Sequence, residues 1–250
     1  MKTLAGKTAI VTGASRGSGR VAALALAKAG AQVIVHHRQS LGEAQALVAE
    51  IREIGSRSDA IAADLSTPDG PHQLARRVRA IVGERLDILV ANAGMQARAA
   101  AGDMAFDDFS RQFALNVRAP YFLVQQLLPI MCKGSSVVFL LPWLAHAAAT
   151  HRANDAAVVG AVQTLTRHFA LVLGERGIRV NALSIDLALD QPAIAARIAV
   201  AGLSSAVTFL ASDAARWITG EIVRINSTAE LSREEADPAF RIPTVATTAG

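Results

Sequence analysis

The stretch Thr8–Gly30 constrains the fold of this chain more than any other part of the sequence. A short apolar run leads into a glycine-rich turn, and an Ala- and Leu-rich run follows as far as Gly30. The glycines of the turn are Gly13, Gly17 and Gly19. Glycines allow close backbone approach to a pyrophosphate, and a helix start offers free N–H groups and a positive dipole end. Because a second β-type run, Gln32–His36, comes directly afterwards, the pattern predicts a nucleotide-phosphate cradle between a strand and a helix.

The composition favours an aliphatic core, because 52 % of the residues are hydrophobic and only 4 % are aromatic. Such a core suits buried parallel strands covered by Ala-rich helices. The formal net charge is +4, but the densest basic group, Arg76, Arg77 and Arg79, lacks the aromatic pattern of a nucleic-acid surface. We therefore expect no nucleic-acid partner. We also expect no signal peptide, no membrane-spanning segment and no metal site, and a cytoplasmic protein.

Strand-like and helix-like runs alternate along the chain. Strands are expected at 8–12, 32–36, 57–62, 86–91, 135–141, 179–183 and 221–225. Helices are expected at 17–29, 41–54, 70–82, 106–131, 154–174 and 204–212. This alternation predicts right-handed βαβ crossovers in an α/β fold: one Rossmann-type doubly wound domain with a seven-stranded parallel sheet and helices on both faces. The domain is expected to span residues 1–231, and residues 232–250 to form a tail that is flexible or lies on a partner subunit.

The chain resembles the short-chain dehydrogenase/reductase family at five places within residues 1 to about 231. They are the TGASRGSG turn at 12–19, Asp64-Leu65, Asn92-Ala93-Gly94, Asn116 within Leu-Asn-Val, and FLASD with ITG at 209–220. The resemblance implies a cofactor groove and a catalytic role for Asn116. It also implies a homodimer or homotetramer formed through helices 106–131 and 154–174. The cofactor-binding residues expected from these motifs and from the second strand are Gly13, Ser15, Arg16, Gly17, Gly19, His37, Arg38, Asp64, Leu65, Asn92, Ala93 and Gly94.

The end of the second predicted strand bears on which cofactor is used. An acidic residue there would bind the ribose 2′-hydroxyl and repel a 2′-phosphate. This chain has His36-His37-Arg38 instead, and Arg16 lies within the glycine turn. We therefore expect a positive local field and a preference for NADP(H) over NAD(H). The alternative is that Arg16 and Arg38 are ordinary surface charges.

The catalytic region departs from the family pattern. In the family a tyrosine supplies the proton, a lysine four residues later assists it, and a serine thirteen residues earlier binds the carbonyl. An ungapped alignment places Pro142, Asp155 and Val159 at the serine, tyrosine and lysine positions. A gapped alternative places His151 and Asp155 at the tyrosine and lysine positions. With either alignment, no tyrosine or lysine occurs between Ser135 and Gly174.

Asp155 and His151 are the remaining candidates for proton transfer, because they are four residues apart and would share a helix face. Alternatively, Asp155 simply meets the helix dipole after an Asn154 cap, and Asn116 is inherited scaffolding. We expect an enzyme that performs non-redox acid–base chemistry on a small molecule. Two alternatives stay open: a non-catalytic partner subunit that binds a ligand, and an NADPH-dependent carbonyl reductase with an atypical proton donor.

Overall fold

The computed structural model describes residues 2–95, 103–141, 153–186 and 192–226. Seven strands form one sheet in the order β3-β2-β1-β4-β5-β6-β7, and every neighbouring pair is parallel. The strands are β1 (Thr8–Val11), β2 (Gln32–His37), β3 (Ser58–Ala62), β4 (Leu86–Ala91), β5 (Met131–Leu141), β6 (Arg179–Asp186) and β7 (Ile222–Asn226). The predicted doubly wound parallel sheet is therefore confirmed.

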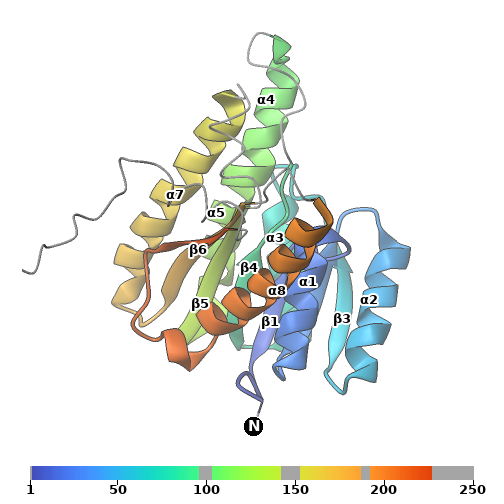
Figure 1. Ribbon diagram of the computed structural model, residues 1–250. Coiled ribbons are helices and arrows are strands. Elements are labelled where there is room, and N and C mark those ends of the chain that lie inside the picture. Colours follow the sequence, from blue (N-terminus) through green and yellow to red (C-terminus); the bar gives the residue numbers. More distant parts are fainter. Residues whose placement is uncertain (1, 96–102, 142–152, 187–191, 227–250) are drawn as a thin grey trace, which may run out of the picture.

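Helices cover both faces of the sheet (Figure 1). One layer holds α1 (Gly17–Lys28), α2 (Leu41–Glu53) and α8 (Pro192–Ala211), and the other holds α3 (Gly70–Val82), α5 (Ala119–Leu127) and α7 (Ala153–Gly174). Successive strand residues serve opposite layers, as in β1, where Ala9 and Val11 face the first layer and Ile10 the second. Buried, mainly aliphatic side chains thus fill two cores, one on each face of the sheet.

The expected single helix over residues 106–131 is wrong. The structure has α4 (Phe106–Phe113), a π-helical turn at Ala114–Arg118, α5, and a 3-10 turn at Leu128–Ile130. Asn116 lies in the π-helical turn. Its side chain forms hydrogen bonds with the backbone N–H and carbonyl of Met95. α4 projects beyond the carboxyl ends of the strands (Figure 1).

Other boundaries also differ from the expectation. β5 begins at Met131 because its first residues pair irregularly with β4: Leu86 faces Met131, but Ile88 faces Ser136. Gly134 has a positive φ of 89° within this irregular entry. α8 begins at Pro192, twelve residues before the expected start at 204. The expected tail at 232–250 lies outside the described residues.

One helix bears on the expectation that no uninterrupted apolar segment reaches membrane-spanning length. Within the described residues, Asn154–Gly174 is long and apolar enough to cross a membrane by length and composition. Val162, Phe169 and Leu173 of this helix nevertheless belong to one of the two cores of the domain. Its hydropathy is therefore that of a helix packed against a sheet.

Candidate nucleotide and catalytic site

A groove of about 620 Å³ opens at the carboxyl ends of β1, β2 and β4. This is where ligands bind in open α/β sheets, at the point where the strand order reverses. Ten of the predicted cofactor residues line it: Gly13, Ser15, Arg16, Gly17, His37, Arg38, Leu65, Asn92, Ala93 and Gly94. The sheet thus brings together residues that are far apart in the sequence.

Asn92, at the end of β4, holds the glycine turn from one side. Its amide nitrogen donates to the carbonyl oxygens of Thr12 and Gly13, each at 3.0 Å, and its amide oxygen accepts from the Ser18 hydroxyl at 2.8 Å. The Thr12 hydroxyl oxygen in turn accepts from the N–H groups of Asn92 and Ala93, each at 2.9 Å. These bonds connect the turn after β1 to the loop after β4.

Two of the three predicted glycines are needed for different reasons. Gly17 has a φ of 57°, in the left-handed region, and a Cβ atom there would meet nothing within 4 Å. Gly19 instead has no room, because a Cβ atom would lie 2.3 Å from the carbonyl oxygen of Gly13. Gly19 therefore packs the helix against the turn, and it does not line the groove.

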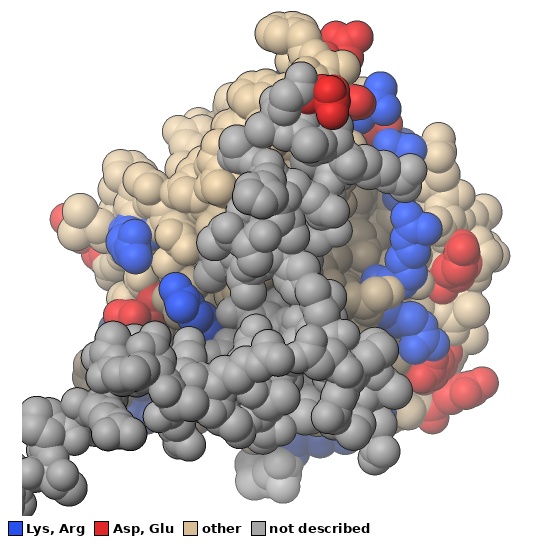
Figure 2. Space-filling model, turned by 45° about the horizontal axis from the view of Figure 1, so that its top comes forward, with Lys and Arg blue, Asp and Glu red and all other residues tan. Residues whose placement is uncertain are grey.

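Positive charge in the groove comes from arginines and not from the two histidines. Arg16, Arg38 and Arg111 line the groove, and Lys and Arg side chains gather along one rim of the hollow at this end of the molecule (Figure 2). Burial lowers the pKa of His37, and it lowers the pKa of His36 to about 4. The expected positive field is thus present, but at neutral pH His36 carries no charge.

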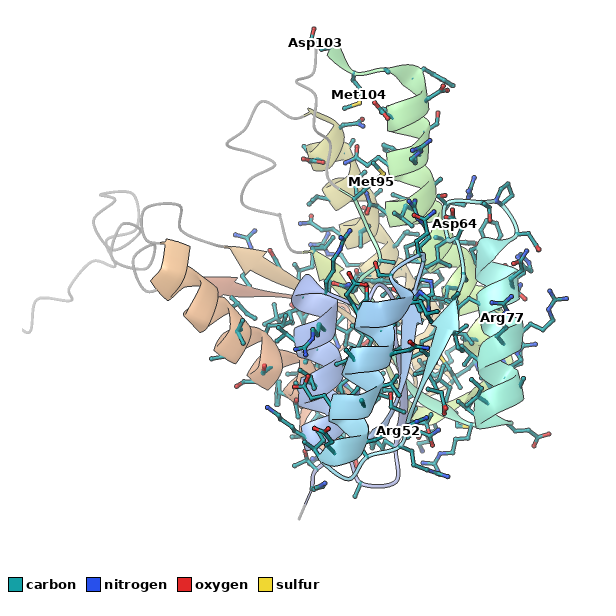
Figure 3. All side chains as sticks on the ribbon, turned by 90° about the vertical axis from the view of Figure 1, so that its right-hand side faces the viewer. Arg52, Asp64, Arg77, Met95, Asp103 and Met104 are labelled. Atoms are coloured by element: carbon teal, nitrogen blue, oxygen red, sulfur yellow. The ribbon has the colours of Figure 1, made fainter. Side chains whose placement is uncertain are left out.

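Asp64 does not line the groove, although it was expected to bind the cofactor. Its carboxylate accepts hydrogen bonds from the Ser66 hydroxyl at 2.6 Å and the Ser66 N–H at 2.9 Å, so it shapes the turn after β3. Burial alone would raise the pKa of Asp64, but these bonds and the charges of Arg38 and Arg111 hold it below its usual value. Asp64 and Met95 lie at the same end of the molecule (Figure 3).

Asn116 lies deeper in the cleft, beside a small cavity of about 20 Å³ that Gly94 and Val158 also line. Its amide donates to the Met95 carbonyl at 2.8 Å and accepts from the Met95 N–H at 3.0 Å. The side chain therefore fixes the backbone at the inner end of the groove, because Met95 also lines that groove.

Asp155 is buried, 2 % exposed, and it is held by Gln112 of α4. The Gln112 amide nitrogen donates to Asp155 Oδ1 at 2.5 Å, and its amide oxygen accepts from Asn154 Nδ2 at 2.5 Å. The same nitrogen lies 3.5 Å from the carbonyl oxygen of Met95. Gln112 therefore connects the start of α7 to the inner end of the groove.

The other predicted catalytic positions are less informative. Pro142 and His151 lie outside the described residues. Val159 is buried on α7, one turn after Asp155.

The residues of the site that were not predicted include His36, Arg111 and Gln112. His36 was treated only as a charge, and Arg111 had no distinguishing pattern. Gln112 was detectable in principle, because it lies four residues before Asn116 and shares its helix face.

Comparison with known proteins places this fold among redox proteins. Residues 7–187 match the family described as short chain dehydrogenase. The chain is 32 % identical to L-rhamnose 1-dehydrogenase (NAD(P)(+)) of Sphingomonas sp. (strain SKA58), over 90 % of this chain and 97 % of that protein. It is 36 % identical to the hydroxynaphthalene reductase-like protein Arp2 of Metarhizium majus, over 73 % of this chain and 68 % of that protein.

Two solved structures extend the comparison. One is the landomycin C-6 ketoreductase LanV with bound NADP and rabelomycin, 33 % identical, with a TM-score of 0.81 over 90 % of this chain and 96 % of that one. The other is a short chain dehydrogenase from Burkholderia cenocepacia J2315 in complex with NADP, 31 % identical, with a TM-score of 0.83 over 91 % and 99 %.

These comparisons correct the function expected from the sequence. The relatives and structural neighbours are dehydrogenases and reductases, and the likeness extends over most of this chain. Non-redox acid–base chemistry was therefore the wrong expectation, and so was a non-catalytic partner subunit. The lack of a tyrosine or lysine between Ser135 and Gly174 is therefore not a sign of non-redox chemistry in this chain.

Proposed function

Because the chain belongs to the short-chain dehydrogenase/reductase family, we propose that it is an NADP(H)-dependent oxidoreductase acting on a carbonyl or alcohol group of a small molecule. The observation that carries this proposal is the groove at the ends of β1, β2 and β4, with its glycine turn and its rim of arginines. Structures of similar proteins with bound NADP support the choice of cofactor.

The groove fits a dinucleotide with a 2′-phosphate. The start of α1 has no side-chain cap at Arg16, so its N–H groups are available to a pyrophosphate. Nδ1 of buried His37 has no hydrogen-bond partner among the described residues, and His37 lines the groove. An unpaired buried nitrogen of this kind suits a ligand that completes its bonding. We assign the 2′-phosphate to Arg38 and His37, and the pyrophosphate to the turn at 13–17.

The bound cofactor would supply or accept the hydride, and the protein would handle the proton. Reduction of a carbonyl adds a hydride to its carbon and a proton to its oxygen, and oxidation of the alcohol reverses both steps. We propose that Pro142, Asp155 and Val159 replace the family's serine, tyrosine and lysine, so that this chain lacks the usual proton donor. Asp155 is then the candidate that exchanges the proton.

Three features support this role for Asp155. It is an ionisable side chain on the helix that carries the family's tyrosine, it is buried, and Gln112 fixes the direction of its carboxyl group. We call the region around Asp155 and Gln112 the proton-transfer end of the cleft. Gln112 and Asn116 both contact the carbonyl oxygen of Met95, at 3.5 and 2.8 Å, so the backbone at Met95 links this end to the groove. Asn116 is accordingly a positioning residue for this end of the cleft.

We also propose that a homodimer or homotetramer forms through α4, α5 and α7. These helices expose large apolar side chains: Phe106, Phe109, Tyr121, Leu171 and Val172. Leu171 is 78 % exposed, and burying it against a second copy would be favourable. Sedimentation of Leu171→Asp should give a smaller species than the unaltered protein. An unchanged sedimentation coefficient would argue against this interface.

A calorimetric titration with NADPH and NADH tests the proposed cofactor. We expect stoichiometric binding of NADPH, with a Kd at least about tenfold below that for NADH, because a 2′-phosphate adds charge-assisted hydrogen bonds. Tighter binding of NADH, or binding of neither, would refute the assignment.

A further inference from the structure

We propose that His36 is a positioning residue that fixes the backbone of the glycine turn for nucleotide binding, through a hydrogen bond from the Gly13 N–H to its Nδ1 atom. The proposal rests on the proposed function, since it concerns the turn to which the pyrophosphate is assigned. It adds a role for a side chain that itself needs no contact with the nucleotide.

The His36 ring joins three segments of the chain. Gly13 N lies 3.0 Å from His36 Nδ1, and His36 Nε2 lies 3.1 Å from the carbonyl oxygen of Ala63, just after β3. The His36 carbonyl also accepts from the Ala14 N–H at 2.9 Å. The ring is 2 % exposed, so these contacts are made away from water.

The chemistry of the two partners defines the state of the ring. A backbone N–H can only donate, so Nδ1 must accept with its lone pair. A carbonyl oxygen can only accept, so the proton of the neutral ring must lie on Nε2. A second proton, on Nδ1, would point at the Gly13 N–H and break this hydrogen bond. It would also make the ring positively charged, which burial opposes.

The hydrogen bond from the Gly13 N–H to His36 matters because it holds one end of the Thr12–Gly13 peptide unit. The Thr12 carbonyl accepts from Asn92 at 3.0 Å, and the N–H of the same peptide donates to His36. The Thr12–Gly13 peptide plane is therefore held at both ends, from β4 on one side and from β2 on the other. Gly13 has a φ of 61°, a left-handed conformation in which this plane leads into the turn.

Two amide substitutions separate the two bonds of the ring. In His36→Asn the amide oxygen can take the place of Nδ1, which keeps an acceptor for Gly13 and loses the bond to Ala63. In His36→Gln the longer amide reaches toward the position of Nε2, which keeps a donor for Ala63 and loses the bond to Gly13. Both variants place a neutral amide in the same buried site, so each serves as the other's control.

We expect His36→Gln to raise the Kd for NADPH about tenfold or more and His36→Asn to change it by less than about threefold. Hydrogen exchange of the peptide that contains residues 12–16, measured without cofactor, should quicken in His36→Gln and stay near the unaltered rate in His36→Asn. Equal effects of the two variants, or the reverse order, would overturn the proposal.

The exchange measurement separates this inference from the proposed function. If the unaltered protein binds no NADPH, the proposed function fails, while the exchange rates still decide the role of His36. If a variant does not fold, ¹⁵N chemical shifts of the His36 ring in the unaltered protein decide instead. A proton on Nε2 supports the proposal, and a proton on Nδ1 overturns it.

Discussion

The two ends of the cleft are held together in different ways. At the nucleotide end, Asn92 and His36 hold the Thr12–Gly13 peptide from the ends of two strands that flank β1. At the proton-transfer end, Asp155 of α7 is held by Gln112 of α4, a helix that projects beyond the sheet. The ends of the strands are held in place by the backbone hydrogen bonds of the whole sheet, whereas a contact between two helices depends on a few side chains. The binding geometry can therefore persist if the residue proposed to transfer the proton changes.

The largest expected effect concerns the proton-transfer end. Asp155→Asn preserves the shape of the side chain but removes its ability to exchange a proton, so turnover should fall at least about a hundredfold. The Kd for NADPH should stay within about twofold, because Asp155 does not line the groove. Steady-state rates and a binding titration on the same preparation measure both. Unchanged turnover would remove Asp155 from the mechanism.

The nucleotide end should be sensitive to a single methyl group. Gly19→Ala places a Cβ atom 2.3 Å from the Gly13 carbonyl oxygen, so the free energy of unfolding should fall by roughly 3 kcal/mol. Gly17→Ala is the matched control, since it meets nothing within 4 Å and bears only the cost of its left-handed backbone, about 1 kcal/mol. Urea denaturation of both variants gives the comparison. Equal losses would show that the close contact at Gly19 does not matter.

The buried His36 ring makes the nucleotide end sensitive to acid. Its pKa is lowered from 6.5 to about 4, mainly by burial. The hydrogen bond to the Ala63 carbonyl opposes this shift, His37 lowers the pKa slightly further, and Asp64 raises it slightly. The unfolded chain therefore takes up a proton that the folded chain refuses, and stability falls as the pH drops from 6.5 toward about 4. Between pH 7 and pH 5 this contributes a loss of roughly 2 kcal/mol.

Urea denaturation at the two pH values measures that loss, and His36→Asn should lack most of it. A variant with the same pH dependence as the unaltered protein would contradict the assignment. Asp64 and Asp213 add losses in the same direction at lower pH. The pKa of partly buried Asp64 is lowered by its hydrogen bonds from Ser66 and by nearby arginines, and the pKa of exposed Asp213 is lowered by Lys7.

The smallest expected effect concerns cofactor choice. Arg38→Leu should raise the Kd for NADPH about tenfold and leave the Kd for NADH nearly unchanged, because only NADPH carries the 2′-phosphate. Arg52→Leu is a suitable control, since Arg52 lies at the opposite end of the molecule from Asp64 and Met95 (Figure 3). Parallel losses for both cofactors would place the 2′-phosphate elsewhere.

Much of the nucleotide end could be predicted from the sequence, because its residues lie in short motifs directly after strands. Gly13, Asn92 and Arg38 need only the strand order to be brought together. The roles within that end were harder to predict: Asp64 shapes a turn, and His36 is neutral because it is buried. Burial and hydrogen-bond partners depend on packing, which a local pattern does not contain.

The proton-transfer end was predicted poorly for a related reason. Gln112 and Asp155 are 43 residues apart, and the π-helical turn at Ala114–Arg118, which interrupts the expected single helix, was not predicted. Asp155 could be predicted from its place in the alignment, but no sequence pattern pointed to the Gln112 that holds it. The lack of a tyrosine or lysine between Ser135 and Gly174 led to the expectation of non-redox chemistry, which the redox relatives contradict.

Transfer of deuterium from NADPH deuterated at the nicotinamide C4 most directly tests the central claim that this cleft performs redox chemistry. The label should be offered with a panel of small aldehydes, ketones and sugar lactones, and the products examined by mass spectrometry. The account predicts deuterium at the former carbonyl carbon of at least one product, and its loss in Asp155→Asn. Saturable NADPH binding without deuterium in any product would contradict it.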